Sequence, residues 1–274
     1  VMGILNGTTN YILTKMSEEG ADYGEALAEA QELGYAERDP TADVEGYDAG
    51  AKAAIIAMIA FGAQVVAGDV YHEGIGQLTS ADIAVAHRLG YAVKLLGIAE
   101  RDAATGAIAV RVHPALVPVH HPLASVRESF NAVFVEGDAV GSLMFYGRGA
   151  GGAPTASAVL GDVIDAAVNL AKGTHASLGA FAKAKTRAID ETSSEYLISL
   201  DVADQPGVLH AVTGAFAQHG VSIRAAEQEG IGPDARLVFI THEALEADVQ
   251  ATMRVLRDLP VVSRVGGLIR VIGS

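Results

Sequence analysis

The sequence has no cysteine among its 274 residues. Without thiols the chain forms no disulfide, carries no thiolate nucleophile and offers no cysteine ligand to zinc. A chain that needs no disulfides is compatible with a reducing compartment, and we expect a cytoplasmic location. Disulfide-stapled small domains and thiolate enzymes are therefore excluded.

Positive charge is also scarce. Lys and Arg number 19 against 33 Asp and Glu, so the formal net charge is −14 and the pI is near 5.0. Such a surface repels nucleic-acid phosphates and anionic lipid, and we expect neither nucleic acid nor a membrane as a partner. Half of the residues are hydrophobic and 19% are charged, which is typical of a globular protein.

Long hydrophobic runs are missing too. The most apolar stretch, residues 53–67, is shorter than the roughly 20 residues that a membrane-spanning helix needs, and it contains Gly62 and Gln64. It therefore predicts a buried core helix. The first residues, VMGILNGTTN, resemble no signal peptide. They lack an initiator methionine at position 1, and we interpret the chain as part of a longer product.

The N-terminal part reads as one strand and three helices. Asn6-Gly7 is typical of a turn, Gly20 and Gly34 fit helix ends, and Asp22 with Glu25 forms a capping-box pattern. The expected elements are a strand at residues 1–5 and helices at residues 9–19, 22–33 and 46–61, with an acidic loop at residues 35–45.

The middle of the chain predicts one further helix, then strands. Thr79-Ser80 caps a helix, and Gly137-Asp138 signals a hairpin turn. Three prolines accompany His113, His120 and His121, and we interpret this region as a surface loop without metal-ligand spacing. Strands are expected at residues 91–100, 107–112, 132–136 and 139–146, and a helix at residues 155–170.

The pattern changes near the C-terminus. Residues 173–194 are small and polar, and we interpret them as a linker between a first domain, residues 1–172, and a second, residues 195–274. The second domain reads as strand, helix, strand, strand, helix, strand, which is the ferredoxin-like order. The expected fold class is α/β in the α+β sense, with a mixed or antiparallel sheet in the first domain.

The acidic loop and the helix after it carry the strongest candidate chemistry. Asp48 and Lys52 are four residues apart and share a helix face. A lysine beside carboxylates at the edge of a core can serve as a proton donor. Several carboxylates, here Glu37, Asp43 and Asp48, suit a substrate ammonium group. The alternative is an ordinary acidic loop with an exposed ion pair.

Two glycine-containing turns are further candidates. GRGAGG, residues 147–152, fits G-x-G-x-x-G, but no second strand ending in an acidic residue follows, so a complete dinucleotide fold is not expected. Its backbone amides could approach a phosphate or ribose, or it could be a plain turn. In DQPGVL, Pro206 and Gly207 fit the first turn of a helix, as a plain turn or a ligand site.

Four segments together resemble the homoserine dehydrogenase family. They are GILNGTTNYIL (residues 3–13), LGYAERDPTADVEGYDAGAK (residues 33–52), Tyr91 with KLLGIAE (residues 94–100) and GRGAGGAPTASAVLGDV (residues 147–163). They occur in family order between residues 1 and about 172. The tail around DQPGVL resembles an ACT domain, a regulatory appendage of amino-acid biosynthesis.

The resemblance implies NAD- or NADP-dependent interconversion of L-aspartate 4-semialdehyde and L-homoserine, on the route to threonine, isoleucine and methionine. By position, Lys52 is similar to the family's catalytic lysine. Glu37 and Asp48, helped by Asp43 and with Thr8 facing the substrate, resemble the residues that hold homoserine. Gly34 resembles a glycine that contacts the cofactor, and Gly149 and Gly151 resemble the loop near the nicotinamide.

The family's dinucleotide-binding domain, second active-site lysine and metal-binding loop match nothing in this sequence. The resemblance therefore implies that the cofactor is bound mainly elsewhere and that this chain alone is inactive or nearly so. It also implies a homodimer or homotetramer, formed through apolar faces at residues 91–98 and 132–146, and threonine as regulatory ligand. Two alternatives remain: an amino-acid-sensing dimerisation module without catalysis, and another NAD-dependent enzyme with an ACT tail.

Overall fold

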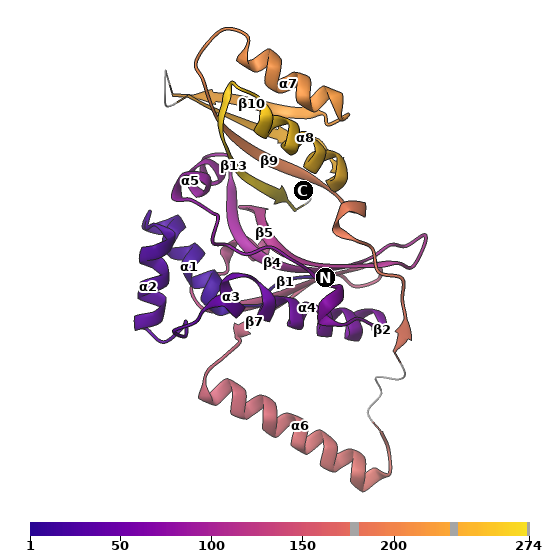
Figure 1. The fold of residues 1–274 in the computed structure, drawn as a ribbon. Helices are drawn as coiled ribbons and strands as arrows, with labels where there is room; N and C mark the ends of the chain where they lie inside the picture. The colour runs from indigo at the N-terminus through magenta and orange to yellow at the C-terminus, as the bar shows by residue number, and fades with distance from the viewer. Residues whose placement is uncertain (176–180, 231–234, 273–274) are drawn as a thin grey trace. The chain divides into compact units, whose positions relative to one another are not determined.

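The computed structural model describes residues 1–175, 181–230 and 235–272 (Figure 1). The chain divides into two compact units. Unit 1 comprises Val1–Gly76, Lys94–His113 and Ser125–Arg187, and unit 2 comprises Gln77–Val93, Pro114–Ala124 and Ala188–Ser274. The strands β4 (Tyr91–Arg101) and β5 (Ile108–Pro118) contribute residues to both units.

Unit 1 begins with a short strand followed by helices. They are β1 (Met2–Ile4), α1 (Gly7–Glu18), α2 (Tyr23–Glu32), α3 (Thr41–Val44) and α4 (Tyr47–Phe61). The expected capping box of Asp22 and Glu25 is present, and Gly20 and Gly34 follow the ends of α1 and α2 as expected, each with positive φ. The reading of Asn6-Gly7 as a turn was wrong, because the Asn6 side chain caps α1 and the helix starts at Gly7.

An antiparallel sheet forms the centre of unit 1. The strand β1 lies between β4 and β6 (Phe130–Gly137), with Met2 opposite Ile98 on one side and Phe134 on the other. The expected hairpin joins β6 to β7 (Gly141–Arg148). The buried apolar core of the unit includes Ile4, Leu5, Ile12, Leu13 and Leu96.

Shorter elements complete the unit. Strand β2 (Ala63–Gln64) pairs in parallel with β8 (Ala182–Lys183), and β3 (Tyr71–His72) pairs in parallel with β5. A 3-10 turn, Ala67–Asp69, lies between β2 and β3. Strand β8 lies within residues 173–194, so the segment interpreted as a linker contains a paired strand; residues 176–180 of it lie outside the described part.

The proline-rich segment differs from its prediction. Strand β5 continues through Pro114 to Pro118, and His113 is buried within it rather than lying in a surface loop. Proline has no backbone N–H to donate, so it limits strand pairing. Accordingly, the parallel pairing with β13 is short: it involves Ala115 and Leu116, which lie between Pro114 and Pro118. His120 is exposed, as expected, and His121 is half-buried. A 3-10 turn, Pro122–Ser125, follows.

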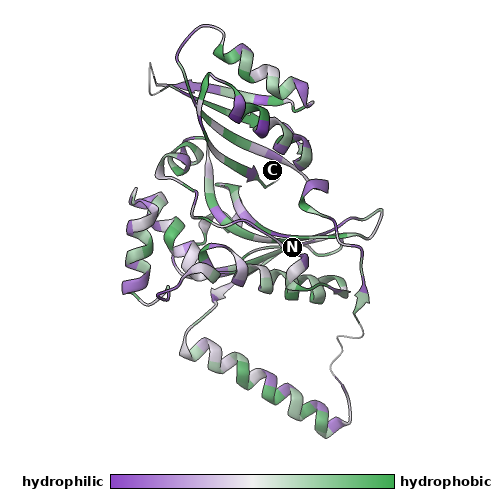
Figure 2. Cartoon of the chain, in the orientation of Figure 1, coloured by the Kyte–Doolittle hydropathy of each residue, from purple (hydrophilic) through white to green (hydrophobic). Residues whose placement is uncertain are grey.

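The long helix α6 (Gly152–Lys172) has no buried residue. Figure 2 shows hydrophobic residues along this helix, and the exposed ones include Val159, Leu160, Val163 and Ile164. A helix gains most of its stability in a protein by burying such an apolar face. The face of α6 is therefore uncovered in this chain.

Unit 2 has the predicted ferredoxin-like order. Its elements after residue 188 are a 3-10 turn (Ile189–Glu191), β9 (Ser193–Val202), α7 (Val208–Gln218), β10 (Ile223–Glu229), β11 (Arg236–Thr241), β12 (Ala244–Leu245), α8 (Glu246–Asp258) and β13 (Val262–Val271). The sheet runs β10-β11-β9-β13. Tyr196, Phe216, Phe239 and Leu256 lie in its core.

Two details of unit 2 bear on the sequence predictions. Helix α5 (Ser80–Arg88) is capped by Thr79 as expected. Helix α7 starts after Gly207, whose φ of 92° makes it the residue before the helix; placing Pro206 and Gly207 in the first turn was wrong. Within the described ranges, no helix combines the length and apolar character needed to cross a membrane.

Candidate active site

The start of α4 places the predicted lysine and carboxylate on one helix face. Gly46 adopts φ 82° between α3 and α4, and a Cβ there would lie 3.0 Å from Val112 Cγ1, so glycine suits this tight turn. Asp48 Oδ2 then accepts a hydrogen bond of 2.7 Å from Lys52 Nζ. The predicted i,i+4 proximity of Asp48 and Lys52 is confirmed, and it is common to the catalytic interpretation and to the alternative of an exposed ion pair.

Helix α4 presents two different faces. Its buried residues are small, Ala49, Gly50, Ala53, Ala54 and Ala57. The Lys52 and Asp48 side chains are 46% and 34% exposed, so solvent and a small molecule can reach them. A pair this open adds only about 0.3–0.5 kcal/mol to stability. Stability alone is therefore a weak reason for its presence.

Asn6 joins the carboxylates of Asp43 on α3 and Asp48 on α4. Its Nδ2 donates to Asp43 Oδ1 at 2.7 Å and to Asp48 Oδ2 at 2.9 Å. Lys52 Nζ also donates to the carbonyl oxygen of Leu5 at 3.1 Å. Sequence reasoning missed Asn6; an asparagine before Gly-Thr-Thr signals a helix cap, but nothing local signals contacts 37 and 42 residues away.

The loop between α2 and α3 is tied to the first turn of α1. Thr8 Oγ1 donates to the Tyr35 carbonyl at 2.6 Å, and the rings of Tyr11 and Tyr35 lie 4.9 Å apart. Thr8 thus lies next to Asn6 at the edge of the site. Gly34, with φ 76°, is exposed, and nothing lies within 4 Å of where its Cβ would be, so its backbone is open to a ligand.

Glu37 lies in the same loop, with its side chain exposed. Its carbonyl oxygen accepts a hydrogen bond of 3.0 Å from Gln31 Nε2. Among the residues that the structure describes, its carboxylate joins none of the hydrogen bonds that link Asn6, Asp43, Asp48 and Lys52. The structure therefore brings three of the four predicted charged residues together and leaves Glu37 outside that hydrogen-bonded set.

Asn131 lies close both to the glycine loop after β7 and to the start of α1. A Cβ on Gly149 would lie 2.6 Å from Asn131 Cγ, and one on Gly7 would lie 3.4 Å from Asn131 Oδ1. Gly151 has φ 114° and precedes α6. Because β7 is antiparallel to β6, this loop does not belong to a parallel dinucleotide-binding unit.

A buried lysine of β4 contacts Asn10 of α1. Lys94 Nζ donates to Asn10 Oδ1 at 3.1 Å and to the Val126 carbonyl at 2.5 Å. Burial lowers the pKa of Lys94 to about 8, while the charge of Glu18 raises it and that of Arg127 lowers it further. Asn10 in turn donates to the Glu128 carbonyl at 2.8 Å. These bonds fix the segment that enters β6.

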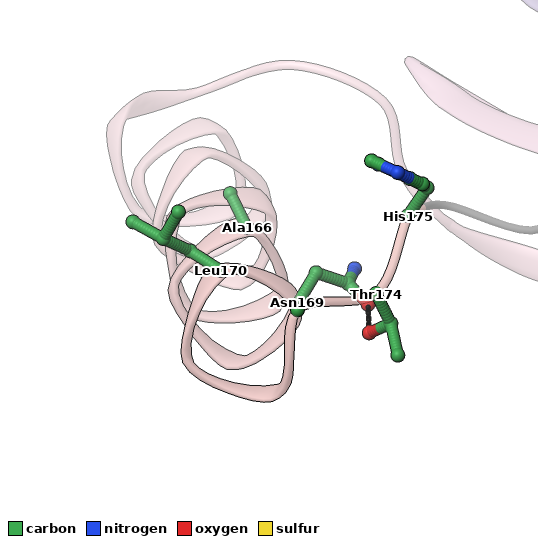
Figure 3. A pocket seen from close by; sticks show the side chains of 6 residues that line it. Ala166, Asn169, Leu170, Thr174 and His175 are labelled. Carbon is green, nitrogen blue, oxygen red and sulfur yellow. Dashed lines mark hydrogen bonds between the residues drawn. The ribbon is translucent and has the colours of Figure 1, made fainter.

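A hollow of ≈ 450 Å³ lies at the C-terminal end of α6 (Figure 3). It is lined by Ala166, Asn169, Leu170, Gly173, Thr174 and His175. It contains no carboxylate and no lysine, so we place the chemistry at Asn6, Asp43, Asp48 and Lys52 instead. Over the described part of the chain, no three His, Asp or Glu side chains gather in a way that could hold a metal ion.

Comparison with known proteins identifies both parts of the chain. The family model for homoserine dehydrogenase matches residues 1–164, and that for the ACT domain matches residues 196–261. A homoserine dehydrogenase of Corynebacterium glutamicum is 52% identical over 274 residues, which cover 98% of this chain and 62% of that protein.

Solved structures agree. The crystal structure of a homoserine dehydrogenase from Thiobacillus denitrificans superposes with a TM-score of 0.93 at 39% identity, covering 99% of this chain and 63% of that one. A hyperthermophilic archaeal homoserine dehydrogenase mutant in complex with NADPH gives a TM-score of 0.51 at 31% identity, covering 61% of this chain and 47% of that one. The chain thus spans less than two thirds of the length of these relatives. Because the family model covers more than half of its residues, the chain belongs to the homoserine dehydrogenase family.

Proposed function

We propose that the protein containing this chain interconverts L-aspartate 4-semialdehyde and L-homoserine with NAD or NADP. The observation that carries the proposal is the exposed group of Lys52, Asp48 and Asp43, held on two helices and linked by Asn6. An amino-acid substrate needs negative charge for its ammonium group, and an aldehyde needs a proton donor at its oxygen. This group supplies both within one hydrogen-bonded set.

The roles follow from the charges. Asp43 and Asp48, with Glu37 from the neighbouring loop, bind the substrate ammonium group. In the reducing direction, the Lys52 ammonium donates a proton to the aldehyde oxygen as a hydride adds to the carbon. In the oxidising direction, neutral Lys52 accepts the hydroxyl proton, so atoms and charge balance in both directions. Thr8 borders the substrate from the first turn of α1.

The nicotinamide cofactor supplies or accepts the hydride when it is bound. Gly34 and the segment from Gly149 to Gly151 are exposed, and this segment leads into the N-terminus of α6, which fits the approach of such a group. We propose that most of its binding surface lies outside this chain. The archaeal relative solved with NADPH supports a nicotinamide cofactor without deciding between NAD and NADP.

Replacing Lys52 with alanine tests the proposal. In the full-length protein, Lys52→Ala should lower the rate of homoserine oxidation at least about 100-fold, because the proton acceptor is lost. Lys183→Ala is the control, since it removes an exposed lysine of β8, outside the acidic loop and α4. Unchanged turnover in Lys52→Ala would refute the assigned role. A wild-type protein that does not oxidise homoserine would refute the function itself.

We propose further that the ACT domain binds threonine as a feedback regulator and that the protein is a cytoplasmic homodimer or homotetramer. Strand β7 supports an interface, because Leu143, Phe145 and Tyr146 are exposed on it. Strand β4 does not, because Val93, Leu95 and Ile98 are already buried. Millimolar threonine should raise the melting temperature of the chain. A threonine-dependent shift in a full-length protein that does not oxidise homoserine would favour a sensing module instead.

A further inference from the structure

Asn6 uses both ends of its amide. Its Oδ1 accepts from the Thr9 backbone N–H at 2.9 Å, which caps α1. A carbonyl oxygen is needed there, so the amide nitrogen must face the opposite way, toward Asp43 and Asp48. The two donors of that nitrogen are used on the two carboxylates. The orientation of this amide is therefore fixed by a backbone donor on one side and two acids on the other.

The contacts of Asn6 also reach the lysine. Asp48 Oδ2 accepts from both Asn6 Nδ2 and Lys52 Nζ, at 2.9 and 2.7 Å. The second partner of Lys52 is the carbonyl oxygen of Leu5, the residue just before Asn6. The corner formed by Leu5 and Asn6 thus sets where the lysine and both carboxylates lie. Asn6 is 5% exposed, and Thr9, which also donates to it, is 1% exposed.

We propose that Asn6 is a positioning residue for the reaction proposed above, on which this inference rests. Two carboxylates side by side repel each other, and the neutral Asn6 amide holds both in place without removing their negative charge. The pair stays available for the substrate ammonium group, and the shared oxygen of Asp48 keeps Lys52 in a single position. Asn6 touches neither the substrate nor the cofactor in this role; it acts through Asp43, Asp48 and Lys52.

Two substitutions separate positioning from helix capping. Serine, aspartate and asparagine cap helices about equally well. Asn6→Ser and Asn6→Asp therefore keep the cap of α1 but remove both donors to the carboxylates. If Asn6 is only a cap, both variants should behave like the wild type. If it positions the site, both should lose activity at an unchanged melting temperature.

The assay is homoserine oxidation by the full-length protein. We expect Asn6→Ser to lower kcat/KM about 10- to 100-fold, with a rise in KM and a fall in kcat, because the charge-assisted bonds to both carboxylates are lost. Asn6→Asp should lose more, because it adds a third carboxylate. Its loss should shrink as the pH falls toward about 6, where protonation of the introduced carboxyl restores a donor. Asp22→Ser, a cap change on α2, is the matched control.

Each outcome decides the inference. A kcat/KM within about twofold of the wild type in Asn6→Ser would overturn it. If both variants lose activity and also have a lower melting temperature that accounts for the loss, Asn6 has a structural role, and the inference is overturned as well. Failure of the proposed function is recognised separately, because it would appear as missing activity in the wild type or retained activity in Lys52→Ala.

Discussion

Lys94 offers a quantitative test of the contact between β4 and α1. This lysine of β4 is 4% exposed, and its ammonium group donates to Asn10 and to the carbonyl of Val126. Burial lowers its pKa from 10.5 to about 8. The perturbation is Lys94→Met, which keeps the length and apolar stem of the side chain and removes the charge.

The magnitude follows from the two pKa values. A fall from 10.5 to about 8 is about 2.5 units, and at about 1.4 kcal/mol per unit the buried charge costs about 3 kcal/mol of folding free energy below pH 8. Between pH 8 and 10.5 the unfolded chain binds more protons than the folded chain. The contribution of Lys94 to stability therefore rises with pH through this window and is complete above 10.5.

The assay is urea unfolding of the wild type and Lys94→Met at about pH 7 and pH 9.5. From pH 7 to pH 9.5, we expect the free energy of unfolding of the wild type to rise by about 2 kcal/mol more than that of Lys94→Met. The reason is that roughly 1.5 pH units of the window from pH 8 to 10.5 are crossed. Lys172→Met, which removes an exposed lysine of α6, controls for loss of any lysine. Equal pH dependence in the wild type and Lys94→Met would refute the reasoning.

Two further predictions concern stability. Glu246→Gln should lower the free energy of unfolding by about 3–5 kcal/mol, because it leaves Arg270 buried without the carboxylate that now lies 2.7 Å away. A melting temperature unchanged from the wild type would contradict this. Glu128→Gly should stabilise the chain by about 0.5–1 kcal/mol, since Glu128 has φ 53° and its backbone is fixed by Thr14 and Asn10. Calorimetry should show a higher melting temperature for Glu128→Gly than for the wild type. Glu128→Ala should show no such rise.

Local patterns explain which elements the sequence predicted. The capping box of Asp22 and Glu25, the hairpin at Gly137 and the i,i+4 pair of Asp48 and Lys52 depend on residues within four positions of each other. These three signals are satisfied by contacts between near neighbours, whereas Asn6-Gly7 and Pro206-Gly207, which are equally local, folded differently from their predictions. The family resemblance likewise depends on short sequence motifs, in four segments of the chain.

Long-range contacts decided the rest. The strand through Pro114 and Pro118 forms because β13, more than 140 residues later, pairs with Ala115 and Leu116 between these prolines. Burial of His113 follows from the same strand. No periodicity in a proline-rich segment can report a partner that distant in sequence.

The proposed active-site group shows the same division. Charge and helical spacing made Lys52, Asp48 and Asp43 candidates beside the alternative of an exposed ion pair, and their roles came from the resemblance to the homoserine dehydrogenase family. Only the tertiary structure showed that Asn6 binds both carboxylates while Glu37 remains outside the hydrogen-bonded set. An amide has two hydrogen-bonding ends, and the partner of each end is fixed by the folded arrangement of β1, α3 and α4 rather than by the residue itself.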